Sequence, residues 1–147
     1  KMVDGAITDG SNMGAAMAFA AADSIITYFR ESGTKPGAFD LIVTGDLGFE
    51  GGTILCDLMR AEGFCMDDRY TDCGQLIYHR TKQDVHGGGS GCGCSAVVLA
   101  SYLLPLLESG DASDILLIGT GAMMSPSSIQ QGFSIPAVAH LLRFSAI

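Results

Sequence analysis

Hydrophobic residues along this chain gather in blocks that end at a glycine. The first block, Ser11–Arg30, predicts a helix, because Ser11 or Asn12 can cap its first turn and Gly33 follows it as a stop. The block is apolar on nearly every side, which is typical of a helix buried in a layered fold. Two further helices are predicted over Gly52–Glu62 and Cys94–Leu107.

Shorter apolar runs between these helices predict β-strands. The pattern indicates strands at Val3–Thr8, Asp40–Thr44 and Ile115–Ile118, and allows a short one at Leu76–Tyr78. The run Ser134–Arg143 fits a strand or a helix, since a short apolar run does not separate the two. The stretch Thr81–Gly91 is polar and glycine-rich and is expected to be a loop.

Alternating strands and helices predict an α/β fold with a largely parallel sheet and helices on both faces. Ligands of open α/β sheets bind beyond the carboxyl ends of the strands. Three glycine-rich loops are expected at that edge, namely the loops after Thr44, before Cys94 and after Ile118. A functional site is therefore expected there.

Composition narrows the classes of function. The 147 residues and 15.3 kDa fit one domain, or one half of a two-part domain. A net charge of -8 argues against a nucleic-acid partner and against an electrostatic membrane anchor. Hydrophobic residues make up 48% and charged residues 16%, so the chain is expected to bury surface against more than itself. Five cysteines, an odd number, indicate reduced cytosolic thiols, and no signal peptide or membrane span is expected.

The most distinctive motif is the run His86–Ser95, HGGGSGCGCS, which opens the third predicted helix. Bare amide groups beside a helix N-terminus favour an anion such as a carboxylate. Alternatively, the glycines only allow tight packing, and the residues leave both interpretations open. The run is not a phosphate-binding P-loop, because no Gly-Lys-Ser/Thr follows it. Gly91-x-Gly93-x-x-Ala96 matches a loose dinucleotide pattern, but Asp114 begins the next strand rather than ending it, so a nicotinamide or flavin site is disfavoured.

Cys92 and Cys94 lie near the start of the third predicted helix, a position that lowers the pKa of a thiol. No general base is evident within reach, so packing beneath the loop is favoured over a reactive thiol. A zinc site built from these two cysteines with Cys65 and Cys73 is disfavoured by the irregular spacing.

Acidic side chains offer a second set of metal ligands. The aspartates concerned are Asp46, Asp67, Asp68, Asp72 and Asp84. They match no EF-hand pattern, and most are expected to be solvated loop charges. No metal site is predicted.

Four stretches taken together resemble one protein family, that of stage V sporulation protein AD. They are Asp9–Met17 (DGSNMGAAM), Leu41–Gly48 (LIVTGDLG), Gln83–Ala96 (QDVHGGGSGCGCSA) and Ile118–Pro136 (IGTGAMMSPSSIQQGFSIP). The similarity runs from about Met2 to about Arg143. Several motifs in the right order make it specific, although no single motif would suffice.

The resemblance implies a thiolase-like fold, similar to the ketoacyl synthases, in which two related βαβαβαββ halves form a five-layered sandwich. Residues 1–147 resemble the C-terminal half as a single half-domain, with a mostly parallel five-stranded mixed sheet. The N-terminal half, which carries the nucleophilic cysteine in such enzymes, is expected to be absent from this chain. The apolar segment Met13–Ile26 would then lie in a central layer between the halves.

The family is known for binding dipicolinic acid, pyridine-2,6-dicarboxylate, and for moving it with calcium into the developing spore. Condensing enzymes of this fold use a His and an Asn from the C-terminal half to stabilise negative charge. The His would fall in the loop Gly45–Gly48, which holds Asp46 instead, and the Asn would fall near Ser90. Because a carboxylate repels a developing carbanion, no catalytic residue is predicted, and non-catalytic binding is expected.

The implied ligand site lies at the loop edge. The residues expected to bind the ligand are Asp46, Gly48, Ser90, Gly91, Cys92, Cys94 and Thr120. Backbone amides of Gly89–Cys94 and Gly119–Gly121 would hold the planar dianion, and calcium would supply positive charge as a co-ligand. Two alternatives remain: an acyl-transferring or condensing enzyme that uses a cysteine, and a structural subunit that only docks partners.

The resemblance also implies partners and a location. The expected partners are other proteins of the spore dipicolinate transport system, some of them membrane-embedded, and the N-terminal half of the same fold. A homo-oligomer is expected for the complete protein. The expected location is cytoplasmic, peripheral to the inner membrane of the developing spore.

Overall fold

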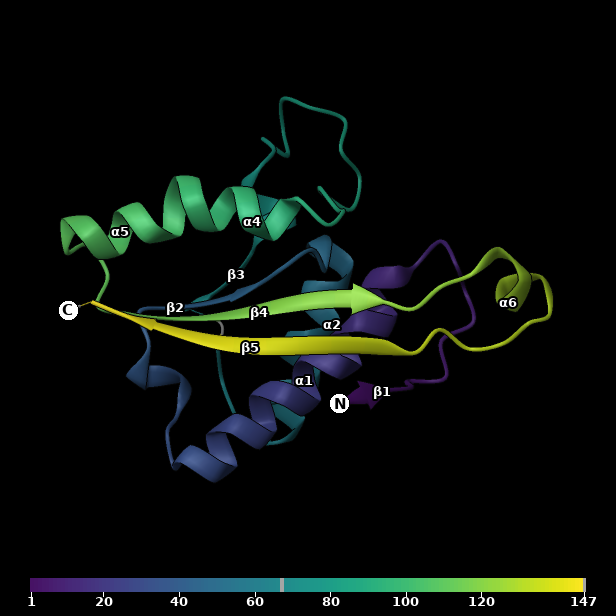
Figure 1. Cartoon of the computed structure of the whole chain (residues 1–147), viewed down its shortest axis with the longest axis horizontal. Coiled ribbons are helices and arrows are strands. Elements are labelled where there is room, and N and C mark those ends of the chain that lie inside the picture. Colours follow the sequence, from purple (N-terminus) through teal and green to yellow (C-terminus); the bar gives the residue numbers. More distant parts are fainter. Residues whose placement is uncertain (67, 147) are drawn as a thin grey trace.

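The computed structural model describes residues 1–66 and 68–146, and it contains a five-stranded mixed sheet (Figure 1). The strands are β1 (Met2–Val3), β2 (Leu41–Thr44), β3 (Tyr70–Asp72), β4 (Asp114–Ala122) and β5 (Ala137–Ser145). Their order across the sheet is β1-β5-β4-β2-β3. Strand β2 pairs in parallel with β3 and β4, whereas β5 runs antiparallel to both of its neighbours.

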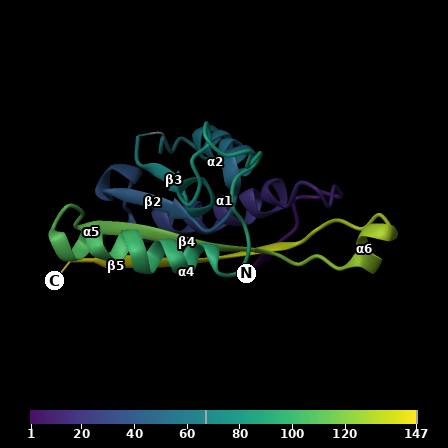
Figure 2. The ribbon, with the colours of Figure 1, turned by 90° about the horizontal axis from the view of Figure 1, so that it is seen from above.

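Helices cover both faces of this sheet, as predicted (Figures 1 and 2). They are α1 (Met13–Ser32), α2 (Gly48–Ala61), α3 (Cys73–Leu76), α4 (Cys94–Val98), α5 (Leu104–Ser109) and α6 (Pro126–Gln130), with a 3₁₀ turn at Pro36–Ala38. Helices α1 and α2 lie on one face, and α4 and α5 lie on the other. The prediction of an α/β fold is therefore confirmed.

The two central strands bury both of their faces, which explains why they read as continuous apolar runs. Ile42 and its register partner Leu116 pack toward α1 and α2, in one hydrophobic cluster. Val43 and its partner Leu117 pack toward α4 and α5, in a second cluster. The alternation along each strand thus joins the sheet to both helical layers.

Helix α1 is buried by elements of this chain. Its start is capped as predicted, because Asn12 Oδ1 accepts a hydrogen bond from the Ala15 amide at 3.2 Å, and Gly33 ends it with φ 67°. The sheet covers one side of the helix, and α2 crosses it where a Cβ on Gly51 would lie 2.7 Å from the Gly14 carbonyl oxygen. Its burial is thus explained by this chain alone, without a second half above it.

Two predicted elements differ from the structure around α2. The helix begins at Gly48 rather than Gly52, because a buried carboxylate accepts hydrogen bonds from its first amides. The strand allowed at Leu76–Tyr78 is wrong, since those side chains are exposed and the third strand is Tyr70–Asp72. The Tyr70 hydroxyl and the Asp72 carboxylate make hydrogen bonds inside the protein. The strand is therefore buried without being a hydrophobic run in the sequence.

The helix predicted from Cys94 forms, but it passes through a π-helical turn at Leu99–Leu103 before α5. Pro105 lies one residue into α5, where it lacks an amide hydrogen and its ring crowds the carbonyl four residues earlier. A wider turn just before the proline relieves that crowding.

Strand β4 extends beyond the predicted end at Ile118, because it pairs with β5 from Asp114 to Ala122. This pairing decides that the ambiguous run near the C-terminus is a strand. Strand β1 is shorter than the predicted Val3–Thr8, since Ala6 takes φ 57° and leaves the extended conformation.

Large apolar side chains remain exposed on the segment from α4 to α5, on β5 and on the segment that joins β4 to β5 and contains α6. They are Val97, Tyr102, Leu104, Leu142, Met123, Met124 and Phe133. No helix among the described residues has the length and hydrophobicity needed to cross a membrane.

Candidate ligand-binding site

A cleft of about 700 Å³ opens at the carboxyl ends of β2 and β4. Its walls come from the start of α1, the loop after β2, the glycine loop (residues 86–93) and the end of β4. These are segments far apart in the sequence, and they meet at the edge where the sequence predicts a site.

Six of the seven residues expected to bind a ligand line this cleft. They are Asp46, Gly48, Ser90, Gly91, Cys92 and Thr120. The seventh, Cys94, is buried beneath the loop in the hydrophobic cluster on the α4 side. Burial, reinforced by the carboxylates of Asp72 and Asp46, raises the pKa of the Cys94 thiol to about 11. The idea that the helix start lowers the pKa of the thiol is therefore wrong for Cys94. The prediction that this cysteine packs beneath the loop is confirmed.

Asp46 bridges three of the segments that form the cleft. Its Oδ1 accepts a hydrogen bond from Thr120 Oγ1 at 2.8 Å, and its Oδ2 accepts one from the Gly91 amide at 3.0 Å. Its own amide donates to Thr120 Oγ1 at 3.2 Å. The carboxylate thus ties the end of β2 to the end of β4 and to the glycine loop, and both of its oxygens are engaged.

Asp72 lies buried beneath the cleft and forms a hub, a carboxylate that accepts hydrogen bonds from several segments. The prediction that it is a solvated loop charge is therefore wrong. The residue is 0% exposed. It accepts hydrogen bonds from Thr44 Oγ1 (2.6 Å) and from the amides of Leu47 (2.8 Å), Gly48 (3.0 Å) and Gly74 (2.9 Å). Burial raises the pKa of this carboxyl group, and the four hydrogen bonds oppose that rise.

The segments held by Asp72 clamp the glycine loop from two sides. The Phe49 amide donates to the Gly87 carbonyl at 2.9 Å, and the Gly89 amide donates to the Gly74 carbonyl at 2.7 Å. A Cβ on Gly48 or on Gly74 would collide with a carbonyl oxygen of the loop. Gly48 also has φ 69°, so glycine is required there for two reasons. Tight packing is thus one use of these glycines.

Several amides of the glycine loop remain available. Among the described residues, the amides of Ser90, Cys92 and Gly93 donate to no acceptor of the protein. Ser90 and Cys92 line the cleft. Unengaged amides in a concave, glycine-lined site are the arrangement that binds anions.

The cleft is also lined by residues outside the seven expected ones, among them Asn12, Met17, Glu50 and His86. Glu50 lies in the first turn of α2, directly after the loop that follows β2. His86 takes φ 43°, unusual for a residue with a side chain, and its Nε2 lies 3.3 Å from Asp84 Oδ1. His86 begins the motif HGGGSG, which was the available signal for it.

Metal ligands do not gather in the described part of the chain. Among residues 1–66 and 68–146, no three His, Cys, Asp or Glu side chains are placed so that they could hold a metal ion together. Asp67, one of the aspartates weighed as a ligand, lies outside the described residues.

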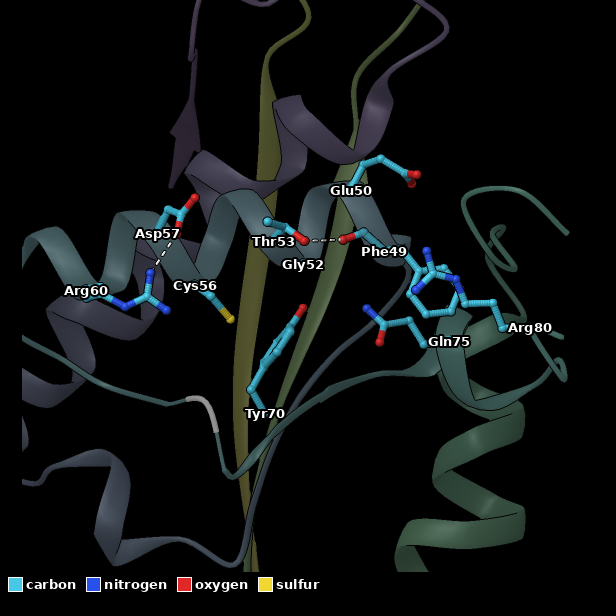
Figure 3. A pocket seen from close by; sticks show the side chains of 10 residues that line it. All are labelled: Phe49, Glu50, Gly52, Thr53, Cys56, Asp57, Arg60, Tyr70, Gln75 and Arg80. Atoms are coloured by element: carbon cyan, nitrogen blue, oxygen red, sulfur yellow. Dashed lines mark hydrogen bonds and ion pairs between the residues drawn. The ribbon is translucent and has the colours of Figure 1, made fainter.

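A second cavity, of about 390 Å³, lies between α2, β3 and α3 (Figure 3). The guanidinium of Arg80 stacks 3.9 Å from the centroid of the Phe49 ring. Tyr70 forms the floor, where its hydroxyl is 2.7 Å from Thr44 Oγ1 and burial raises its pKa. Glu50 lines both this cavity and the cleft.

Comparison with known proteins places the chain in a family. The family profile of stage V sporulation protein AD matches residues 1–145. Over 140 residues the chain is 43% identical to Stage V sporulation protein AD of Bacillus subtilis (strain 168). The match covers 95% of this chain and 41% of that relative, so the chain spans less than half of the relative's length. This chain belongs to the stage V sporulation protein AD family.

Proposed function

We propose that this chain is part of a non-catalytic protein that binds dipicolinic acid and serves the import of calcium dipicolinate into the developing spore. Membership of a sporulation protein family supplies the setting. The observation that carries the binding proposal is the pair of unengaged amides at Ser90 and Cys92, inside a cleft at the strand ends.

The cleft suits a flat ligand that carries carboxylates. Glycines line one wall, so a planar ring can approach the backbone without meeting side chains. One carboxylate would accept hydrogen bonds from the glycine loop, and the other would face Thr120 and Gly121 at the end of β4. Asp46 would hold these two walls at a constant separation, because it binds both of them.

The element order supports a thiolase-like half. The main elements follow one another as βαβαβαββ, and among the described strands β5 alone runs in the direction opposite to the other four. The exposed side chains Val97, Tyr102 and Leu104 favour a covering partner on the α4–α5 side, for which we propose the N-terminal half of the same fold. A homo-oligomer, membrane-embedded transport partners and a site at the inner membrane of the developing spore complete the proposal.

Chemical features in the cleft and directly beneath it favour binding over catalysis. With a pKa of about 11, the Cys94 thiol is protonated near neutral pH and is a poor nucleophile. Asp46 occupies the loop where a condensing enzyme would need a hydrogen-bond donor, and both of its oxygens are engaged. An acetyl adduct found by intact-mass measurement after incubation with acetyl-CoA would instead support the acyl-transfer alternative.

Calorimetric titration tests the binding proposal. The full-length protein and this chain are each titrated with dipicolinate and with pyridine-2-carboxylate, which lacks one carboxylate. We expect the full-length protein to bind dipicolinate more tightly, because only dipicolinate has a second carboxylate to reach the wall at the end of β4. If the full-length protein binds neither compound, the proposal is refuted. A structural subunit that only docks partners then becomes the better interpretation.

A further inference from the structure

The cleft is negatively charged, although the proposed ligand is an anion. Two acidic side chains, Asp46 and Glu50, line it, and no lysine or arginine of the described residues does. His86 is the lining side chain that can carry positive charge, and it already faces Asp84 at 3.3 Å. A free dianion would therefore enter a site whose side chains repel it.

Of the two acidic side chains in the cleft, Glu50 is the one whose carboxylate is not held by hydrogen bonds from described residues. Both oxygens of Asp46 accept hydrogen bonds, whereas Glu50 has no hydrogen bond or ion pair with any described residue. A Cβ added at Gly87 would lie 3.0 Å from Glu50 Oε2, so the carboxylate stands directly beside the glycine loop. Figure 3 shows it pointing away from Tyr70, at the edge of the second cavity. The neighbouring cation, Arg80, stacks on Phe49 and makes no ion pair with Glu50.

We propose that Glu50 makes the cleft select its ligand by charge, admitting the neutral calcium chelate of dipicolinate in preference to the free dianion. This inference rests on the proposed function. Two like charges about 4 Å apart weaken binding roughly fivefold even in bulk water, and a ligand with two charges is repelled more strongly. In the chelate the calcium cancels the ligand's charge, so the repulsion largely disappears. Glu50 is thus a specificity-determining residue rather than a ligand of the metal.

The matched variants are Glu50→Gln and Glu108→Gln in the full-length protein. Each removes one negative charge and keeps the side-chain shape, but Glu108 lies on α5, on the opposite face of the sheet from α2. Both variants and the wild type are titrated with dipicolinate alone and with calcium dipicolinate, at low and at high salt. The measured quantity is the ratio of the two dissociation constants.

For the wild type we expect the chelate to bind more tightly than the free dianion. In Glu50→Gln, affinity for the free dianion should rise about three- to tenfold while affinity for the chelate changes little. The gain should shrink at high salt, because counterions screen an exposed charge. An unchanged ratio in Glu50→Gln, or an equal change in Glu108→Gln, overturns the inference. Absence of binding of either form by the wild type would refute the proposed function itself.

Discussion

Replacement of Asp72 by alanine is expected to destabilise this fold more than replacement of any exposed carboxylate. Asp72 is 0% exposed and accepts four hydrogen bonds, three of them from backbone amides. Those amides belong to the start of α2 and the start of α3, and both segments clamp the glycine loop. The variant therefore removes the acceptor that joins the sheet edge to the wall of the cleft.

The expected magnitude follows from the number of donors left without an acceptor. An unsatisfied buried donor costs about 1–3 kcal/mol, and water that enters the vacated space recovers part of this. Asp72→Ala should thus cost about 3–5 kcal/mol, a large share of the roughly 5–15 kcal/mol that stabilises a typical domain. Asp72→Asn keeps one oxygen. If that oxygen serves Gly48 and Gly74, Leu47 loses its acceptor, whereas Thr44 Oγ1 can turn its hydrogen to Tyr70 and accept from the new amide group. We therefore expect about 1–2 kcal/mol.

Urea unfolding followed by circular dichroism measures these costs through the shift in midpoint. Asp40→Ala is the matched control, since Asp40 accepts from the Ser113 and Asp114 amides at 2.7 and 3.0 Å but lies at the surface. Water can replace it, so we expect a loss below about 1 kcal/mol. Hydrogen exchange should also show lost protection at Gly89. If Asp72→Ala destabilises no more than Asp40→Ala, the reasoning about the hub is refuted.

The same carboxyl group predicts a pH dependence with a definite sign. Burial raises its pKa above the ordinary value of 3.8, so the folded protein holds this proton more tightly than the unfolded chain. A protonated Oδ2 can donate to Thr44 Oγ1, whose own hydrogen then turns to Tyr70. The stabilisation is complete below about pH 3.8 and is lost as pH rises through the folded pKa. The stability of wild type relative to Asp72→Asn should therefore grow as the pH is lowered from neutral toward 3.8; a constant or opposite difference would contradict this.

Three further changes test other parts of the structure. Thr120→Val removes a hydroxyl that binds Asp46 in both directions, so we expect a loss of about 1–2 kcal/mol in urea unfolding and weaker dipicolinate binding in calorimetry. Gly51→Ala puts a Cβ 2.7 Å from the Gly14 carbonyl oxygen and should cost about 1–3 kcal/mol, whereas a change near zero would mean that the α1–α2 crossing is looser than described. Cys94 should resist iodoacetamide at pH 7.5 in peptide mass mapping, because its pKa of about 11 keeps the thiol protonated; alkylation as fast as that of the exposed cysteines would count against this.

Local features of the fold could be predicted from the sequence because they depend on neighbouring residues. The capping side chain of Asn12, the alanine-rich block after it and the glycine stop at Gly33 define α1 within two residues at each end. The apolar runs of β2 and β4 indicate central strands. The rule that ligands meet open sheets at the carboxyl ends of strands then predicted the edge where the cleft lies.

Charge and burial in the cleft could not be predicted in the same way, because they depend on residues far apart in the chain. Asp46 meets Thr120, 74 positions away, and Asp72 meets Gly48, 24 positions away. A periodicity or a cap signal extends over one or two turns, so it contains no information about such pairs. Composition and local pattern thus determined an α/β chain with a glycine-lined edge. Only the tertiary structure decided that Asp72 is a buried hub, that the Cys94 thiol stays protonated and that Glu50 stands beside the loop, since each follows from which distant segments exclude water around it.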